Sequence, residues 1–399
     1  MSHIVKFKIA GLVGRKDVYE QKLNRDLNVF FGLNGSGKTS LLRILDSAMS
    51  GDADILRIVP FESAEVTIYS INYQKEFVRT ISKDVLLGGT KGGKRRARIR
   101  TVPTVEVEEV METPYQLALP PLEKHVRWKV SPSQPGTAET SWAHVYLPTW
   151  RLYPGSDLYA PSLQTEPGFT VEREQDLDRF FGRRLEQLWF RYSNQLLSEI
   201  QKIQEDGLAS ILKGILAPRT RRKKLTPIDY RTAYQRVAAF LERQGSPGIL
   251  GDPEVFERRC ASELGIRRIV EDINTIEQQI ERSKVSRNRL EQLIRDMFSG
   301  HKKIVFKDTG IDVETDEGQN IGLASLSSGE KQALWIFIAT LLAEASTLLI
   351  DEPEISLHID WQEQLLSGMQ QLNPDAQVIV ATHAPGIMAK ISDGKIFRL

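Results

Sequence analysis

A glycine-rich segment at residues 32–39 contains the residue types that bind phosphate. It reads Gly-Leu-Asn-Gly-Ser-Gly-Lys-Thr, which matches the pattern G-x-x-x-x-G-K-[ST] at every position. An apolar run at 27–31 precedes it and a helical segment at 40–49 follows it, which is the setting that the motif requires. Backbone N–H groups of such a loop, together with the N-terminus of the next helix, form a cradle for anions. The segment is therefore predicted to bind the phosphates of a nucleotide.

The side chains of this loop suggest individual roles. The expected nucleotide-binding residues are Asn34, Gly35, Ser36, Gly37, Lys38, Thr39 and Ser40. The ammonium group of Lys38 is expected to reach the β- and γ-phosphates, and the hydroxyl of Thr39 is expected to coordinate Mg²⁺. A chance glycine-rich turn is the alternative, and the agreement between motif and setting argues against it.

A second candidate segment is an apolar run at 346–350 that ends in two carboxylates, Asp351 and Glu352. A buried parallel strand delivers its C-terminal residues into the ligand crevice of an α/β sheet. Asp351 is therefore the second expected partner of Mg²⁺, and Glu352 is the expected general base that polarises the attacking water. Taken alone, this run would fit an ordinary strand followed by a solvated turn equally well. The presence of the phosphate-binding loop favours the catalytic interpretation.

His383 directly follows a predicted strand at 377–382. A single histidine is more often structural. At the end of a strand that comes after the Asp–Glu pair, it is predicted to donate a hydrogen bond to the γ-phosphate or to the attacking water.

The segment 326–332, Leu-Ser-Ser-Gly-Glu-Lys-Gln, precedes an apolar helix that is expected at 333–345. Ser327 and Glu330 have the spacing of a capping box, which is the simpler reading. Small residues at a helix N-terminus also form an anion site, open to a phosphate held by another chain. Because one chain has one phosphate cradle, this site implies dimerisation around the nucleotide. Its residues are Ser327, Ser328, Gly329 and Glu330.

Composition limits the class of protein. With 399 residues, two or three packed units of roughly 150 residues are expected. The 53 Lys and Arg residues nearly balance 52 Asp and Glu residues, which argues against a polybasic nucleic-acid coat protein. The single cysteine, Cys260, excludes an intramolecular disulfide and multi-cysteine metal sites. No signal-peptide run and no apolar stretch of about 18 residues is present, so a cytoplasmic chain without membrane contact is expected.

The patterns along the chain predict an α/β fold. Val5, Phe7 and Ile9 alternate as in a strand, and further β-rich stretches are expected at 65–81 and 98–110. Prolines make 112–171 irregular except for a strand at 144–147. Residues 172–217 are helical, and the apolar seam at 269–280 predicts a short coiled-coil hairpin.

Two basic segments, 91–100 and 219–224, are candidates for binding nucleic-acid phosphates. They contain no aromatic residues for base stacking, so the contact would be independent of base sequence. Two solvated loops without a ligand are the alternative, and it is slightly favoured.

Taken together, these motifs resemble those of an ABC-type ATPase. The phosphate-binding loop, the signature at 326–330, the Asp351–Glu352 strand end, the D-loop at 356–358 and the switch histidine His383 occur in that family's order. The segment 351–358, Asp-Glu-Pro-Glu-Ile-Ser-Leu-His, and the wide separation of loop and signature resemble the SMC/Rad50/RecF/OLD branch rather than transporters. Residues 145–151 are similar to a segment of compact ATPases in bacterial anti-phage systems of the Septu, PARIS and retron-associated types.

The resemblance implies an ABC-ATPase head, with a β-rich lobe, a parallel-sheet P-loop core and an inserted helical subdomain. The implied divisions are an N-terminal ATPase lobe at 1–171, a helical insertion at 172–299 and a C-terminal lobe at 300–399. It also implies ATP and Mg²⁺ as ligands, a homodimer or higher oligomer, and a separate nuclease or toxin effector. One feature departs from the family. The Q-loop glutamine expected after the strand at 144–147 is not evident, and Thr149 and Arg151 occupy that region.

Two other functions remain open on the sequence. The basic segments would suit a RecF-like DNA repair or recombination ATPase. A scaffold that binds ATP with little turnover is the other alternative, and Glu352 argues against it. A transporter subunit is the weakest alternative.

Overall fold

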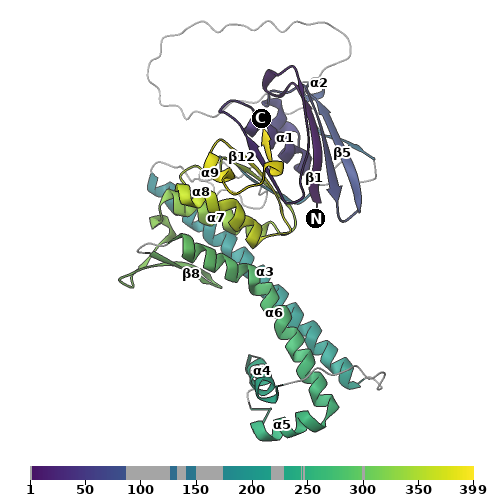
Figure 1. Cartoon of the computed structure of the whole chain (residues 1–399), viewed down its shortest axis with the longest axis vertical. Helices are drawn as coiled ribbons and strands as arrows, with labels where there is room; N and C mark the ends of the chain where they lie inside the picture. The colour runs from purple at the N-terminus through teal and green to yellow at the C-terminus, as the bar shows by residue number, and fades with distance from the viewer. Residues whose placement is uncertain are drawn as a thin grey trace. The chain divides into compact units, whose positions relative to one another are not determined.

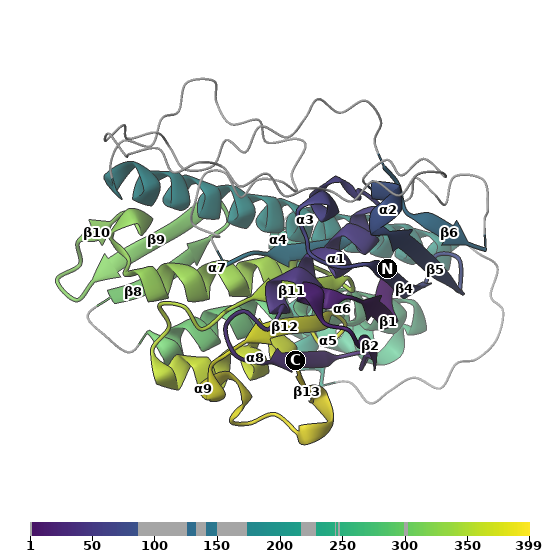
Figure 2. The same cartoon turned by 90° about the horizontal axis from the view of Figure 1, so that it is seen from above.

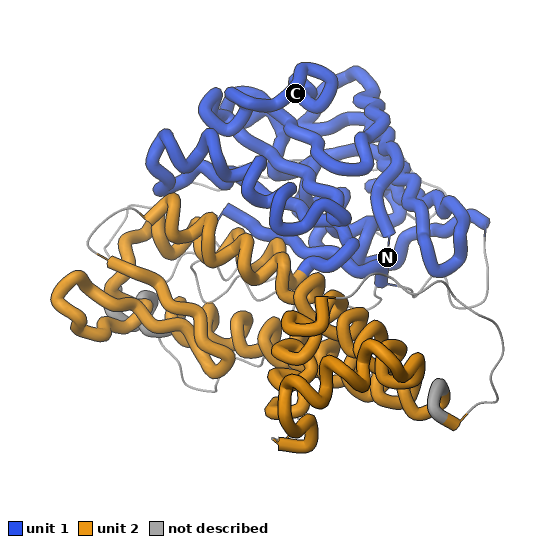
Figure 3. The backbone as a smooth tube through the Cα atoms, turned by 60° about the horizontal axis from the view of Figure 1, so that its bottom comes forward, with its two compact units in different colours: residues 1–168, 343–399 blue, residues 169–342 orange. Residues whose placement is uncertain are grey.

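The computed structural model describes residues 2–86, 126–132, 141–149, 174–216, 229–243, 245, 248–298 and 302–399. They fall into two compact units: Met1–Gly168 with Ala343–Leu399 (unit 1), and Phe169–Leu342 (unit 2) (Figures 1 and 3). The predicted features at 91–100, 98–110 and 219–224, and Arg151, lie outside the described residues. The three-part division of the chain stays a prediction. No helix in the described part of the chain is both long enough and apolar enough to cross a bilayer.

Unit 1 is an α/β structure made from both ends of the sequence, which confirms the predicted fold class. Its strands are β1 (Ser2–Ala10), β2 (Val18–Lys22), β3 (Leu27–Phe31), β4 (Ser63–Ser70), β5 (Lys75–Ser82), β6 (Lys129–Ser131), β7 (His144–Leu147), β11 (Thr347–Asp351), β12 (Gln377–Thr382) and β13 (Ile396–Arg398). Its α-helices are α1 (Lys38–Ser50), α2 (Lys83–Leu86), α8 (Ile359–Leu372) and α9 (Pro385–Met388), and its 3-10 helices are η1 (Leu12–Gly14), η2 (Asp54–Arg57) and η4 (Asp393–Lys395).

The strands of unit 1 form two sheets. One sheet is parallel, in the order β13-β3-β12-β11-β7, and the other is antiparallel, in the order β2-β1-β4-β5-β6. Every residue of β11 and β12 is buried. This explains why both read as nearly continuous apolar runs, since helices and the second sheet cover a parallel sheet on its two faces.

Helix α1 lies in the core that the two sheets share (Figure 2). Leu41, Leu42, Ile44 and Leu45 are fully buried and lie on one face of the helix, so α1 packs an apolar face into this core. The phosphate-binding loop that precedes α1 is therefore anchored to the centre of unit 1 rather than to its surface.

The predicted alternation in the first strand is partly wrong. The register between β1 and β4 shifts between Ile4 and Lys6, which marks a β-bulge. Because a bulge adds one residue to one strand, it reverses the faces of the residues before it. Ile4 is therefore buried with Phe7 and Ile9, whereas Val5 is only half-buried.

Unit 2 consists of a long helical pair and a small sheet. Its helices are α3 (Glu174–Leu216), α4 (Tyr230–Arg243), α5 (Pro253–Ser262), α6 (Leu264–Met297), η3 (Leu323–Ser325) and α7 (Ser328–Leu342), and its strands are β8 (Lys302–Lys307), β9 (Gly310–Thr315) and β10 (Asn320–Ile321). Helices α3 and α6 lie side by side, and α4 and α5 pack at the far end of this pair (Figure 1).

The apolar seam of α6 largely behaves as predicted, except that Ile269 is half-buried and the neighbouring Val270 is buried. Ile273, Ile276 and Ile280 are buried in the helical core. The seam is interrupted where Ser283 donates a hydrogen bond to Glu199 on α3 at 2.7 Å and Arg287 stacks over the ring of Trp189. The short coiled-coil hairpin is thus present, with a polar interruption near the small sheet.

Two further elements differ from the prediction, one strand and one helix. The short strand β6 lies within the stretch expected to be irregular, where it pairs with the edge strand β5. The helix expected at 333–345 begins five residues earlier, at Ser328, because its capping box forms at Ser327. The helix also ends earlier than predicted, at Leu342.

Candidate functional site

The predicted residues of unit 1 meet at one edge of the parallel sheet. The phosphate-binding loop follows β3, Asp351 ends β11, His383 follows β12 and Thr149 follows β7. Because the strands are parallel and adjacent, their C-terminal ends lie at the same edge. The topology of the sheet therefore collects segments that are up to 350 residues apart in sequence.

The backbone of the phosphate-binding loop depends on glycine. Gly35 and Gly37 adopt left-handed conformations, with φ of 82° and 101°. A Cβ atom on Gly37 would also lie 2.5 Å from Cγ2 of Val13, which is too close for any side chain. Helix α1 begins directly after Gly37, so its first N–H groups face the loop.

Lys38 is held tightly against this loop. Its side chain is buried, and Nζ donates hydrogen bonds to the carbonyl oxygens of Gly32 at 2.8 Å and Leu33 at 3.0 Å. The charge of Lys38 is thereby placed inside the curve of the loop, where the predicted phosphate contact requires it.

Three oxygen-bearing side chains converge beside Lys38. The hydroxyl of Thr39 donates to Oδ2 of Asp351 at 2.8 Å, and the hydroxyl of Thr149 donates to the same oxygen at 2.9 Å. Asp351 is almost completely buried. Hydroxyl and carboxylate oxygens are the ligands that Mg²⁺ prefers, so this group fits the predicted metal.

Strand β7, which precedes Thr149, is itself fixed to helix α1. His144 on β7 contacts Oδ1 of Asp46 on α1 through Nε2, at 2.9 Å, and both side chains are buried. Burial, with a further contribution from the charge of Asp351, raises the pKa of Tyr146 above its usual range. The end of β7 is thus closely coupled to the elements that form the phosphate site.

Glu352 lies in the same pocket as the phosphate-binding loop. The pocket measures about 250 Å³ and is lined by Glu352, Val13 and the loop residues Asn34, Gly35, Gly37, Lys38, Thr39 and Ser40. Glu352 adopts a left-handed conformation with φ of 46°, and its N–H donates to the carbonyl of Ala381 at 2.8 Å. Such strain is rare outside glycine and is common at functional sites.

His383 contacts two glutamates. Its Nδ1 lies 3.5 Å from Oε1 of Glu352 and 3.1 Å from Oε1 of Glu354. The structure thus places His383 beside the predicted general base, and it adds Glu354 as a second neighbour.

Three residues of this site were missed or left without a role by sequence reasoning. Val13 lines the pocket in a left-handed conformation, with φ of 54°, and its N–H donates to Pro60. The sequence shows Thr149 in the region where a glutamine is expected and Glu354 within the segment 351–358, but it assigns neither residue a role in the site. The signal for Glu354 was present, because a third carboxylate so close to a buried strand end is unusual on a solvated turn.

The signature residues belong to unit 2 and form a complete capping box. Ser327 N–H donates to Oε2 of Glu330 at 2.6 Å, and Glu330 N–H donates to Oγ of Ser327 at 3.2 Å. Lys302 on β8 braces this turn, since its Nζ lies 3.2 Å from Oε2 of Glu330 and 3.2 Å from the carbonyl oxygen of Ser325. These contacts present the N-terminus of α7, with Ser328 and Gly329 in its first turn.

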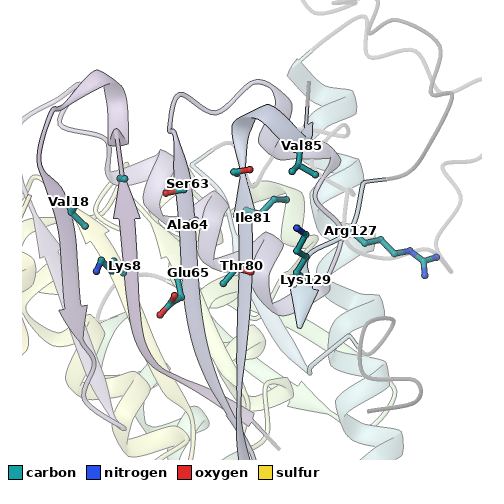
Figure 4. A pocket seen from close by; sticks show the side chains of 12 residues that line it. Lys8, Val18, Ser63, Ala64, Glu65, Thr80, Ile81, Val85, Arg127 and Lys129 are labelled. Atoms are coloured by element: carbon teal, nitrogen blue, oxygen red, sulfur yellow. The ribbon is translucent and has the colours of Figure 1, made fainter. Parts of the chain in front are cut away.

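A larger hollow of about 430 Å³ lies on the antiparallel sheet of unit 1 (Figure 4). Its charged lining is mixed, since Lys8, Arg127 and Lys129 are accompanied by Glu65. It contains none of the predicted site residues, so it does not compete with the pocket at the phosphate-binding loop.

Comparison with known proteins gives one family match and several structural likenesses. Residues 257–389, about one third of the chain, match the family described as "AAA domain, putative AbiEii toxin, Type IV TA system". The Smc head domain of Pyrococcus furiosus is 12% identical, with a TM-score of 0.43 over 98% of this chain and 92% of that one. The Smc head of Pyrococcus yayanosii is 14% identical (TM-score 0.42; 98% and 93% covered), and that of Thermotoga maritima is 10% identical (TM-score 0.38; 97% and 91% covered).

The family match includes the signature, the Asp351–Glu352 strand end and His383. The phosphate-binding loop lies outside the matched range, but it joins the last two in one site at the sheet edge. The chain therefore resembles an ABC-type ATPase of the SMC/Rad50/RecF/OLD branch.

Proposed function

We propose that this chain binds and hydrolyses ATP with Mg²⁺, and that two copies close around the nucleotide to control a separate effector protein. One observation carries the proposal. The phosphate-binding loop and Glu352 line a single pocket, with the Thr39–Asp351 pair and His383 in direct contact with its lining. A triphosphate, a metal and an attacking water require these groups within a few ångströms of one another.

The phosphate chain would lie over the loop at 32–37 and the first turn of α1. There it would accept hydrogen bonds from backbone N–H groups. A phosphate oxygen would compete with the carbonyls of Gly32 and Leu33 for the ammonium group of Lys38. Such an exchange favours the phosphate, because a charge-assisted hydrogen bond to an anion is stronger than one to a neutral carbonyl.

Thr39 and Asp351 are the residues proposed to hold Mg²⁺. When bound, the ion would neutralise charge that develops on the phosphates. Asp351 is already oriented by its two hydroxyl partners, so its carboxylate does not have to reorganise before it acts.

Glu352 is proposed to accept a proton from the attacking water. Its position in the lining of the same pocket as the phosphate-binding loop supports this role. His383, 3.5 Å from Glu352, would donate a hydrogen bond to the γ-phosphate or to that water.

The second copy is proposed to contribute its signature turn. The capping box satisfies Ser327 and Glu330 within the turn. The N–H groups of Ser328 and Gly329, in the first turn of α7, are then available to the partner's γ-phosphate. ATP would favour the closed dimer because it contacts both chains only in that state.

A role in anti-phage defence is the biological context we favour. The matched family is described by a putative toxin of a type IV toxin–antitoxin system, and residues 145–151 resemble the compact ATPases of such defence systems. Because the site described above serves a nucleotide, the nuclease or toxin activity is proposed to reside in a separate protein.

The decisive experiment compares wild type with Lys38→Ala and Glu352→Gln. Lys38→Ala should abolish ATP binding. Glu352→Gln should retain binding, lose turnover and accumulate as a dimer in Mg·ATP, measured by light scattering. Glu363→Gln, which changes a surface glutamate of α8 paired with Lys390, is the matched control. Equal ATP consumption by wild type and Glu352→Gln would show a nucleotide-gated scaffold, and a monomer at saturating Mg·ATP would contradict the shared site.

The defence context is tested separately from the chemistry. A nuclease or toxin reading frame adjacent to the gene, whose product co-purifies with this chain, is the expected result. Salt-sensitive binding of DNA by the purified chain alone, with a repair operon around the gene, would instead favour a RecF-like repair ATPase.

A further inference from the structure

Glu354 is a buried carboxylate that the proposed chemistry does not use. It lies in the turn after β11, and its side chain is 5% exposed. A single oxygen, Oε1, receives the hydroxyl of Thr382 at 2.7 Å and the N–H of His383 at 2.9 Å. The same oxygen lies 3.1 Å from Nδ1 of His383. Glu354 therefore holds both the backbone and the ring of this histidine.

The other carboxylate oxygen carries a cost. Oε2 is buried and has no hydrogen-bond partner among the described residues. A buried polar atom left unsatisfied is unfavourable, and more so in a charged group. Such atoms are rare in native structures, so this oxygen calls for an explanation.

The geometry around the His383 ring explains why Glu354 is buried at this position. Nδ1 lies closer to Oε1 of Glu354 than to Oε1 of Glu352, at 3.1 Å against 3.5 Å, so Glu354 is the nearer carboxylate for a proton on Nδ1. Nε2, on the opposite edge of the ring, then remains for a ligand. The His383 side chain is 43% exposed, which leaves room for that ligand. A carboxylate on one ring nitrogen fixes both the tautomer and the orientation of an imidazole.

We propose that Glu354 is the positioning residue of His383. It holds the Nδ1–H tautomer and presents Nε2 to the γ-phosphate or the attacking water. The proposal rests on the proposed ATPase function, because it assigns a task to Glu354 within that site. The two hydrogen bonds that Oε1 accepts come from a backbone N–H and from the hydroxyl of the preceding residue, so the carboxylate is itself rigidly placed. Rigid placement is what a positioning group requires.

The kinetic test is a double-mutant cycle between Glu354→Gln and His383→Ala. Glutamine retains a neutral acceptor for Thr382 and for the backbone of His383, so the turn can still form. We expect Glu354→Gln to lower kcat about 10- to 100-fold, as for other residues that orient a catalytic group, with KM changed less than about threefold. In the His383→Ala background, Glu354→Gln should have almost no further effect, because its action passes through the histidine.

Glu363→Gln is the matched control for this cycle and should have wild-type kcat. Thermal unfolding of each variant separates a kinetic effect from loss of folded protein. Wild-type kcat in Glu354→Gln, or an equal loss with and without His383, would overturn the proposal.

A second readout does not depend on turnover. Two-bond ¹H–¹⁵N spectra distinguish the ring tautomers, and His383→Ala identifies the signal among the six histidines. Wild type should show His383 protonated at Nδ1, and Glu354→Gln should shift the ring towards the other tautomer. The same tautomer in both proteins would refute the inference. Wild type could bind ATP without hydrolysing it while Glu354→Gln still changes the tautomer of His383. That result would refute the proposed hydrolysis but would support the positioning role of Glu354.

Discussion

The hydroxyl of Thr149 donates to Oδ2 of Asp351 at 2.9 Å, and it shares this oxygen with Thr39. Thr149 lies two residues beyond β7, where the resemblance led us to expect a glutamine. A short hydroxyl side chain therefore contacts the carboxylate that is proposed to hold Mg²⁺, at the position from which a longer amide was expected to act.

Replacing Thr149 with valine should weaken the metal site. Valine keeps the shape of threonine but cannot donate to Asp351, so one of two hydroxyl partners is lost. We expect the Mg²⁺ concentration for half-maximal ATP binding to rise about tenfold, as for other residues that orient a metal ligand. The measurement is titration of a fluorescent ATP analogue with Mg²⁺.

Two controls accompany this prediction. Thr149→Ser keeps the hydroxyl and should resemble wild type. Binding of the same analogue in EDTA should be equal in all three proteins, because the phosphate-binding loop is unchanged. Equal Mg²⁺ dependence in wild type and Thr149→Val would show that Thr149 has no part in the metal site.

Replacing Lys302 with methionine should impair dimerisation without affecting nucleotide binding to the single chain. Lys302 braces the signature turn through Glu330 and the carbonyl of Ser325. Its loss should loosen the N-terminus of α7, at a cost of about 1 kcal/mol, which is roughly a fivefold weaker ATP-driven dimer. Sedimentation of the Glu352→Gln protein with and without Lys302→Met measures the difference.

Lys303→Met is the control for the signature turn. Lys303 is the next residue on β8 and is exposed. It should leave dimerisation unchanged. If the two lysine variants behave alike, the effect comes from strand β8 or from net charge rather than from the brace.

Arg79 should contribute to the stability of unit 1. It is fully buried on β5, donates to the carbonyl of Ala48 at 2.6 Å and stacks on Trp142 at 4.1 Å. Burial lowers the pKa of Arg79 to about 10, which leaves it charged at neutral pH. Arg79→Met removes the donor at the end of α1 and should reduce the free energy of unfolding by roughly 1–3 kcal/mol.

Denaturant unfolding monitored by tryptophan fluorescence tests this stability prediction. Lys75→Met changes an exposed residue on the same strand and should have little effect. If the free energy of unfolding falls less in Arg79→Met than in Lys75→Met, the cost of burying the guanidinium group outweighs the stabilisation from its hydrogen bonds.

The ion pair of Asp26 and Lys395 should make stability depend on pH in the acid range. Burial alone would raise the pKa of Asp26, but the hydrogen bond from Lys395, the backbone hydrogen bond from Leu27 and the charge of Lys395 together outweigh it and lower the pKa below 3.8. The stabilisation is therefore present above pH 3.8 and is lost as the pH falls through the lowered value. Because Asp26 is 45% exposed, water screens the pair, and we expect about 0.5 kcal/mol or less.

The variant for this test is Lys395→Met, with Lys390→Met as the control. Lys390 pairs with Glu363 on the surface. The difference between Lys395→Met and wild type should be measurable at pH 6 and should decrease as the pH falls below 3.8. A difference that does not change with pH would assign the effect to packing of the lysine chain.

Local chemistry explains why much of this molecule was predictable. The strand–loop–helix at 27–50, the strands β11 and β12 and the capping box at Ser327 each depend on residues close together in sequence. Apolar periodicity, glycine spacing and a cap are local signals, and they identified these elements. The β1 bulge was not predictable in this way, since it arises from pairing with β4, about 60 residues later.

The contacts of Thr149 and Val13 have no such local signal, and the position of Glu354 after a buried strand end does not reveal which residues it contacts. Thr149 reaches Asp351 across 202 residues, and its strand joins the sheet only by pairing with β11. Glu354 acquires its role when β12 places His383 beside the turn that follows β11. Val13 enters the pocket because its left-handed backbone turns it towards Gly37.

By itself, the sequence determined which chemistry is possible, because the residue types of the loop at 32–39, of Asp351–Glu352 and of the signature turn each bind phosphate, metal or water. Only the tertiary structure decided which groups act together. Parallel pairing of β3, β12, β11 and β7 brings their C-terminal ends to one edge. This long-range arrangement, and not any local motif, sets the partners of Asp351 and His383.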